Sequence, residues 1–256
     1  MSLPLIKPQA LNPGDTIGIV SPSRWMKEED LARAAGNLKD MGFNVYMHPQ
    51  NARHYNQFAG SDECRADAIE ELFADDKIDG IMCARGGVGS LWLLERLHYD
   101  VIQNNPKIFC GFSDVPALNM AIYGKTGLST FHGPMLHNLL KNENDLTTNA
   151  FTRVVDGALE LMHLSVEQDG ITPVRQGSVT APLIGGNLAL LINLIGTPYD
   201  VPYDGHILFI EDVDEYYYSL DRMLLHLQRA GKLANIKGLI VGDMQDIHDN
   251  EEPYGF

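Results

Sequence analysis

The chain has 256 residues, 45% of them hydrophobic, and its 19 Lys and Arg against 34 Asp and Glu give a formal net charge of −15. This length allows one large or two smaller α/β domains with a packed core. The acidic balance and the scattered positive residues make nucleic acid and membrane surfaces poor partners. The longest apolar run, LALLINLI, is far shorter than the roughly 20 residues of a membrane span.

The N-terminus, MSLPLIKPQALNPGD, has no continuous apolar segment, so neither a signal peptide nor an anchor is expected. The three cysteines are an odd number, and two of them lie in the apolar runs IMCA and IFCG, where a small hydrophobic side chain packs well. A reducing compartment, and therefore a cytoplasmic location, is predicted.

From residue 14 onward, short apolar runs alternate with segments of helical spacing. The predicted strands are 16–20, 44–48, 79–84 and 107–111. The predicted helices are 27–42, a helix capped by Ser61 or Asp62 that carries Ile69, Leu72 and Phe73 on one face, 90–97, and 116–123. Apolar strands that alternate with helices indicate a parallel sheet covered on both faces, so an open, doubly wound sheet is predicted.

The pattern changes between about residues 140 and 180, where polar and turn-rich stretches surround a weakly patterned helix at 151–162. We therefore predict a first domain over 1–145, a linker over 146–178 and a smaller α/β domain over 179–256. The expected elements of the last are a strand at 182–184, a glycine turn, a helix that stops at Gly196, a strand at 206–212, a helix that ends at Gly231 and a strand at 237–243.

Ligand chemistry on open α/β sheets gathers at the carboxyl ends of the strands. Four places follow a predicted strand directly: Arg85-Gly86-Gly87, Ser113-Asp114, Gly185-Gly186-Asn187 and Glu211-Asp212. His132, in TFHGPM, also follows a strand. No Cys and His spacing is typical of a metal site, so neither a metal nor a cofactor is expected.

Ser113 allows two interpretations. Pro116 suits the first turn of a helix, so the positive end of that helix faces Ser113 and favours a developing oxyanion there. Alternatively, Ser113 or Asp114 caps the helix. The stretch lacks the G-x-S-x-G pattern of α/β-hydrolases, because Val115 stands where the second glycine is required.

The glycine run after 79–84 and the acidic residues after 206–210 also allow two interpretations each. The run RGGVGS lacks the third glycine of a dinucleotide fingerprint, so its glycines give backbone N–H groups a close approach to a ligand or simply form a tight turn. Glu211 follows four apolar residues and precedes three more acidic ones, which indicates either a solvated acidic loop or a functional carboxylate.

Six stretches together resemble the LD-carboxypeptidase family of serine peptidases, peptidase S66, which includes muramoyltetrapeptide carboxypeptidase and the microcin-immunity peptidases. They are GDTIGIVSPS, GIMCARGGVGS, KIFCGFSD, TFHGPM, PLIGGNL and ILFIEDVDEYYYSLDRML, and they span nearly the whole chain. The resemblance implies a flavodoxin-like N-terminal domain, a smaller α/β C-terminal domain and an active site between them.

The resemblance also implies roles for individual residues. The nucleophile falls on Ser113 and the catalytic glutamate on Glu211, and the oxyanion hole falls on the backbone N–H groups of Asp114 and of Gly86 or Gly87. The further candidate residues for binding substrate are Arg85, whose guanidinium matches a carboxylate, and His132, Gly186 and Asn187.

The family's histidine, which takes the proton of the serine, lies in a Gly-His segment beyond the strand that matches KGLIVGDM. No such segment occurs before Phe256, and His248 does not fit the motif. We expect a further C-terminal segment that supplies this histidine. The alternative is a family member that binds muropeptides without cleaving them.

The activity implied by the resemblance is removal of the terminal D-alanine from the L,D-linkage of murein tetrapeptides during cell-wall recycling, by a cytoplasmic homodimer. The second enzymatic alternative is an immunity-type peptidase that cleaves an amide between an acidic residue and a nucleotide-like antibiotic. It would use the same residues together with an aromatic side pocket.

Overall fold

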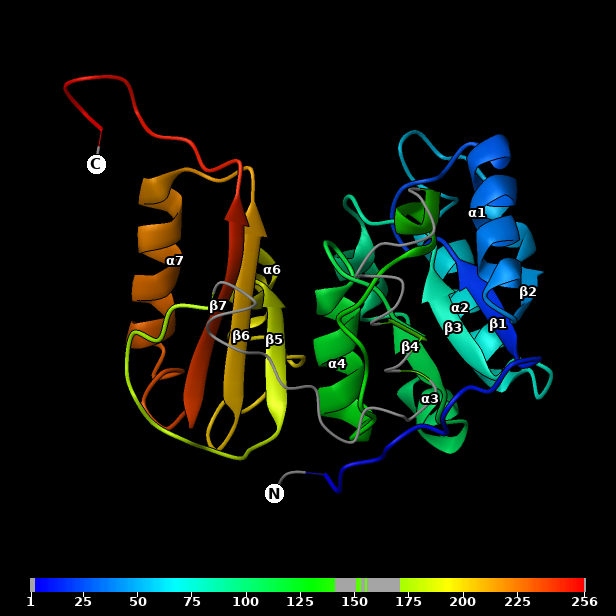
Figure 1. The fold of residues 1–256 in the computed structure, drawn as a ribbon, viewed down its shortest axis with the longest axis horizontal. Helices are drawn as coiled ribbons and strands as arrows, with labels where there is room; N and C mark the ends of the chain where they lie inside the picture. Colours follow the sequence, from blue (N-terminus) through cyan, green and yellow to red (C-terminus); the bar gives the residue numbers. More distant parts are fainter. Residues whose placement is uncertain (1–2, 141–150, 153–154, 156–170, 256) are drawn as a thin grey trace.

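The computed structural model describes residues 3–140, 151–152, 155 and 171–255. Its first sheet has four parallel strands in the order β2-β1-β3-β4 (Figure 1). The strands are β1 (Thr16–Val20), β2 (Asn44–Met47), β3 (Gly80–Cys83) and β4 (Ile108–Cys110). This order, with the first strand between the second and the third, is the flavodoxin-like one, so the predicted doubly wound fold is confirmed.

Helices cover both faces of this sheet, because successive side chains of its apolar strands point to opposite sides. Ile19, Met82 and Cys110 pack in the cluster that contains residues of α1, whereas Ile81 and Phe109 pack in the cluster that contains residues of α2 and α4. The helices and 3₁₀ turns are α1 (Glu28–Asp40), η1 (Pro49–Ala52), α2 (Asp62–Ala74), η2 (Ser90–Leu93), α3 (Tyr99–Asn104), α4 (Pro116–Thr126) and η3 (Leu136–Leu140).

The second sheet has three parallel strands in the order β5-β6-β7. They are β5 (Leu183–Asn187), β6 (Ile207–Val213) and β7 (Gly238–Gln245), and the connecting helices are α6 (Leu188–Leu194) and α7 (Tyr217–Arg229). In Figure 1 the arrowheads of β3, β5, β6 and β7 all point to the upper side. The carboxyl ends of both sheets therefore open toward the same side of the molecule.

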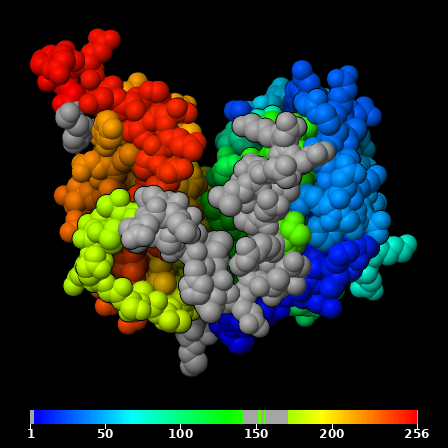
Figure 2. Space-filling model, viewed as in Figure 1, coloured from blue at the N-terminus to red at the C-terminus, as the bar shows by residue number. Residues whose placement is uncertain are grey.

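Helix α4 lies between the two sheets and joins them (Figure 1). Its residues Leu118 and Ile122 belong to the same buried cluster as Ile184 and Leu208 of the second sheet. On its polar side, the Tyr123 hydroxyl lies 2.8 Å from His206 Nε2. One apolar core therefore runs from the first sheet through α4 into the second, and Figure 2 shows the hollow that remains between the two parts at the upper edge.

Two predicted elements differ in the structure. The predicted helix 90–97 is only the 3₁₀ turn η2, and the short helix α3 was not predicted. The predicted glycine turn after residue 184 is part of strand β5: Gly185 and Gly186 have φ of 132° and 137°, and a Cβ on Gly185 would collide with the Phe209 carbonyl of the neighbouring strand. These glycines let β5 approach β6 closely. In the sequence, a pair of glycines required for close approach is indistinguishable from a turn signal.

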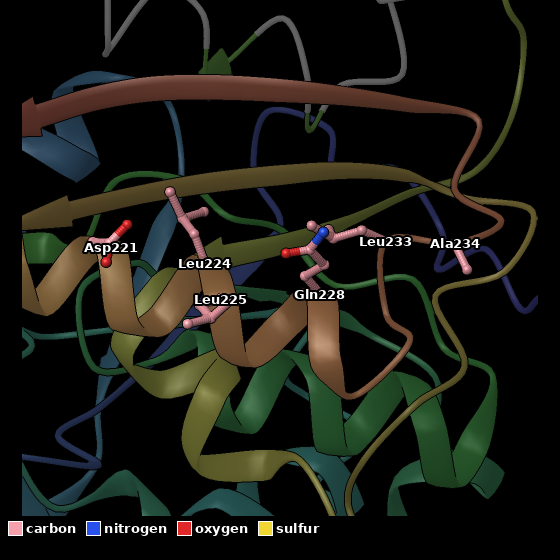
Figure 3. A pocket seen from close by; sticks show the side chains of 6 residues that line it. All are labelled: Asp221, Leu224, Leu225, Gln228, Leu233 and Ala234. Atoms are coloured by element: carbon pink, nitrogen blue, oxygen red, sulfur yellow. The ribbon is translucent and has the colours of Figure 1, made fainter.

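Most of the predicted linker, 146–178, and most of the predicted helix at 151–162 lie outside the described residues. Among the helices that the structure describes, none has the length and apolar content to cross a bilayer. A hollow of about 580 Å³ runs along α7 and the loop that follows it (Figure 3). None of the predicted site residues lines this hollow.

Candidate active site

Ser113 lies in the connection between β4 and α4, and its backbone is in the left-handed region with φ of 66°. This conformation is uncommon for a residue other than glycine and costs about 1 kcal/mol or more, so the surrounding structure must impose it. Gly111, two residues earlier, allows the turn to pack tightly, because a Cβ there would lie 2.9 Å from the side chain of Val115. A serine presented on a strained turn from strand to helix is typical of nucleophiles in α/β enzymes.

Neither Ser113 nor Asp114 caps the helix that follows. Helix α4 begins at Pro116, as predicted, and its N-cap position is Val115, whose side chain makes no capping hydrogen bond. The Asp114 carboxylate instead accepts hydrogen bonds from the Ser23 hydroxyl at 2.5 Å and the Ser90 amide at 2.8 Å. These hydrogen bonds join the turn to the segments that follow β1 and β3, and they are shielded from water because Asp114 is only 4% exposed.

The glycine turn after β3 lies directly against Ser113. A Cβ on Gly86 would come within 2.7 Å of both Cβ and Oγ of Ser113, and within 3.3 Å of the Asp114 amide nitrogen. No acceptor among the described residues is found for the amide N–H groups of Gly86, Gly87 or Asp114. Unpaired amides beside a serine hydroxyl are able to stabilise a developing oxyanion.

Strand β5 brings the second sheet to the same place. A Cβ on Gly186 would lie 2.7 Å from Pro116 Cβ and 3.2 Å from His132 Nδ1. The next residue, Asn187, is in register with Glu211 of β6. The ring of His132 also lies between Phe112 and Phe209, with centroid distances of 6.1 and 5.3 Å. Gly186 and His132 therefore meet Phe112 and Pro116, the residues on either side of the Ser113-Asp114 turn.

Glu211 is a mostly buried carboxyl, with 18% of its side chain exposed. Its Oε1 has no hydrogen-bond partner within the described part of the chain. Burial, and to a lesser degree the negative charge of Asp212, raises the pKa of Glu211 to about 7 from its ordinary 4.5. The folded chain thus holds this proton more tightly than the unfolded chain does, so the contribution of Glu211 to stability falls as pH rises from about 4.5 to 7.

His132 responds to pH with the opposite sign. Burial lowers its pKa from 6.5 to about 4, so the folded chain keeps the ring neutral and loses stability as pH falls from about 6.5 to 4. Its Nε2 lies 3.9 Å from Glu211 Oε1, which is longer than a hydrogen bond. Because burial opposes the charge on both groups, they do not form an ion pair near neutral pH.

The remaining predicted residues have distinct surroundings. Asn187 is buried, its side-chain oxygen accepts from the Leu190 amide, and its Nδ2 donates to Asp212 at 2.8 Å. It therefore caps α6. Arg85 is half-buried, and none of the described residues accepts a hydrogen bond from its Nε. Burial, and then the positive charge of Arg24, lowers the pKa of Arg85.

Two serines of the site were not predicted: Ser23, after β1, and Ser90, after the glycine turn. Both are fully buried and bond to Asp114. The available signal was their position beyond adjacent strands, within the stretches GDTIGIVSPS and GIMCARGGVGS. His248, in contrast, is bound to Asp214, with Nε2 2.6 Å from Oδ1. Among the described residues, no group of three or more His, Cys, Asp or Glu is arranged to hold a metal ion.

Nucleophilic attack by a serine hydroxyl is the chemistry that this arrangement supports, and on a parallel α/β framework it defines an α/β serine hydrolase. Comparison with known families agrees: residues 17–133 match the model of the LD-carboxypeptidase N-terminal domain, and residues 180–255 match that of the C-terminal domain. The chain belongs to the LD-carboxypeptidase family, peptidase S66, so the predicted family and the predicted serine-type carboxypeptidase class are confirmed.

Named relatives and solved structures support this membership. The chain is 36% identical over 242 residues to a probable murein peptide carboxypeptidase of Bacillus subtilis (strain 168), covering 94% of this chain and 75% of the relative. Its fold is similar to the crystal structure of an MccF-like protein from Bacillus anthracis, with a TM-score of 0.82, 29% identity, and coverage of 94% and 81%. A muramoyltetrapeptide carboxypeptidase from Oxalobacter formigenes gives a TM-score of 0.82, 29% identity, and coverage of 94% and 80%.

Proposed function

We propose that this carboxypeptidase hydrolyses the L,D-peptide bond to the terminal D-alanine of murein tetrapeptides, with Ser113 as nucleophile. The single observation that carries the proposal is the contact of the strained Ser113 turn with the Gly86 backbone. The substrate class follows from the names of the relatives, one of which is a probable murein peptide carboxypeptidase at 36% identity.

In the proposed mechanism, Ser113 Oγ attacks the scissile carbonyl carbon and its proton passes to a histidine base. The amides of Asp114 and of Gly86 or Gly87 hold the oxyanion, the C–N bond breaks, and D-alanine leaves with the proton on its amine. Water then hydrolyses the acyl-serine ester. Glu211 Oε1, which none of the described residues bonds, is an open acceptor for the ring N–H of the base. The family resemblance assigns this base to a segment beyond the strand matching KGLIVGDM.

The other candidate residues lie in the second sheet and in the segment after α4. Gly186 gives β5 its close approach to His132, and a cavity of about 210 Å³ lies beside His132, between α4 and the second sheet. Asn187 acts through its neighbours, because its side chain holds α6 and Asp212. The division into domains at 1–145 and 179–256, with the substrate between them, is part of the same proposal.

Ser113→Ala tests the assignment, because it removes the nucleophile and keeps the backbone. Hydrolysis of an L,D-tetrapeptide, followed by chromatography of released D-alanine, is expected to fall by about 10³-fold or more, while the unfolding midpoint stays within a few degrees. Turnover by the variant at the rate of the unchanged protein would defeat the assignment.

A second candidate function is supported by MccF, the microcin C7 self-immunity protein, which has been solved in complex with aspartyl sulfamoyl adenosine and resembles this chain with a TM-score of 0.81 and 27% identity. Assaying this compound beside the tetrapeptide distinguishes the two. Cleavage of the sulfamoyl compound alone would favour the immunity-type activity, and binding of tetrapeptide without product would favour a non-catalytic muropeptide binder.

The location and the assembly belong to the proposal as well. A cytoplasmic homodimer that acts in cell-wall recycling is what the family resemblance implies. Light scattering on the purified chain measures the assembly directly, and a mass of one chain at micromolar concentration would contradict the dimer.

A further inference from the structure

A cationic cavity lies beside the glycine turn, where Arg24 packs on Gly87. It has a volume of about 380 Å³, within the range of small-molecule sites. Its lining includes Arg24, Trp25, Lys27, Gln57 and Arg85. Asp30 and His137 also line it, and Asp30 forms an ion pair with Arg33 at 3.1 Å.

The positive side chains of this cavity lack ion-pair partners in the part of the chain that the structure describes. None of Arg24, Lys27 and Arg85 forms an ion pair with a described residue. Arg24 donates from Nε to the neutral Gln57 at 3.1 Å, and the buried Nε of Arg85 has no hydrogen-bond partner among the residues that the structure describes. Guanidinium groups that repel each other and lack a counter-charge favour an anionic ligand, the more so in a chain with a net charge of −15.

The wall of the cavity packs against the glycine turn and a neighbouring loop. A Cβ on Gly87 would lie 2.6 Å from Arg24 Cδ, so the stem of Arg24 packs on the turn itself. Trp25 stacks on His54 with a centroid distance of 4.5 Å and donates from Nε1 to the Asn56 carbonyl at 2.9 Å. These contacts fix Arg24 and Trp25 against the glycine turn and the loop that contains Asn56.

The position of the cavity relative to Ser113 determines which part of the substrate it binds. Gly86 touches Ser113 and the next residue, Gly87, touches Arg24. Consecutive Cα atoms are about 3.8 Å apart, which is also about the length of one peptide residue. Arg24 thus packs on the residue that directly follows the one touching Ser113, whereas the acidic end of β6, with Glu211 and Asp212, would repel an anion placed there.

We infer that Arg24 and Arg85 form the subsite that binds the free carboxylate of the leaving residue, so that the enzyme acts as a carboxypeptidase rather than an endopeptidase. This inference rests on the proposed function for the choice of peptide. It adds Arg24, which follows strand β1, as a residue that binds the leaving group. A planar guanidinium beside a carboxylate gives two parallel hydrogen bonds, which a neutral carboxamide does not accept equally well.

The test compares an L,D-tetrapeptide with the same peptide bearing a terminal carboxamide, first by calorimetric binding to Ser113→Ala protein. We expect the free acid to bind about 10- to 100-fold more tightly than the amide. In the same background, Arg24→Gln is expected to weaken binding of the free acid by about tenfold and to leave binding of the amide unchanged. Arg24→Lys is expected to restore part of the lost affinity. Arg96→Gln, at an exposed arginine paired with Glu63, is the matched control.

Equal binding of the two peptides, no binding of either, or an equal loss for both peptides in Arg24→Gln would overturn the inference. Turnover of the free acid by the protein with Ser113 intact is then measured separately. Binding selectivity without turnover would contradict the proposed function and keep the subsite, whereas turnover without selectivity would contradict the subsite and keep the function. Arg24 is exposed, so its variants are expected to unfold at the midpoint of the parent protein.

Discussion

The contact between Gly86 and Ser113 yields the sharpest prediction. In Gly86→Ala the added Cβ would lie 2.7 Å from both Cβ and Oγ of Ser113, whereas ordinary contacts begin at 3.4 Å. Ser113 must therefore retreat by about 0.7 Å. Gly86 does not have a positive φ, so alanine meets a steric obstacle there and no backbone strain.

The cost follows from this displacement. Overpacking a rigid contact reduces the free energy of unfolding by about 1–3 kcal/mol. A shift approaching 1 Å in a nucleophile lowers the rate by about 100-fold, because attack requires near-contact geometry. We therefore expect kcat/KM for the L,D-tetrapeptide to fall about 100-fold in a protein that remains folded at 25 °C.

Gly36→Ala is the matched control. Gly36 lies inside α1, and a Cβ there meets no atom within 4 Å. The same substitution should raise the free energy of unfolding by about 0.5–1 kcal/mol and leave activity unchanged. Denaturant titration and D-alanine release are measured on both variants. Gly86→Ala with activity within threefold of the parent protein would refute the reasoning.

Two further predictions concern buried titratable groups. Glu211→Gln should remove the loss of stability between about pH 4.5 and 7, worth about 3 kcal/mol, and leave the loss on acidification that His132 causes; an unchanged pH profile of urea unfolding would contradict this. Burial raises the pKa of Cys83 and raises that of Cys110 to about 12, so a thiol reagent at pH 8 should label Cys64 alone in the native chain and all three thiols in denaturant.

Much of the fold could be predicted from the sequence because its signals are local. Strand β1 coincides with the predicted residues 16–20, and α2 begins after Ser61, whose hydroxyl accepts from the Cys64 amide as a predicted cap. Helix α1 lies within the predicted range 27–42, and Leu31, Ala34 and Leu38, which repeat at helical spacing, are all buried. Period and capping depend on neighbours in sequence, so one chain is sufficient to read them. The roles of Ser113 and Glu211 came from the family resemblance, and they stay predictions.

Only the tertiary structure decided what surrounds those residues. Ser23 bonds to Asp114 across 91 positions, and His132 lies 3.9 Å from Glu211 across the boundary between the two sheets. No local pattern encodes such contacts, because they exist only once α4 packs between the sheets. The raised pKa of Glu211 has the same origin: burial between elements from both halves of the chain removes water from a carboxyl whose neighbours in sequence are acidic.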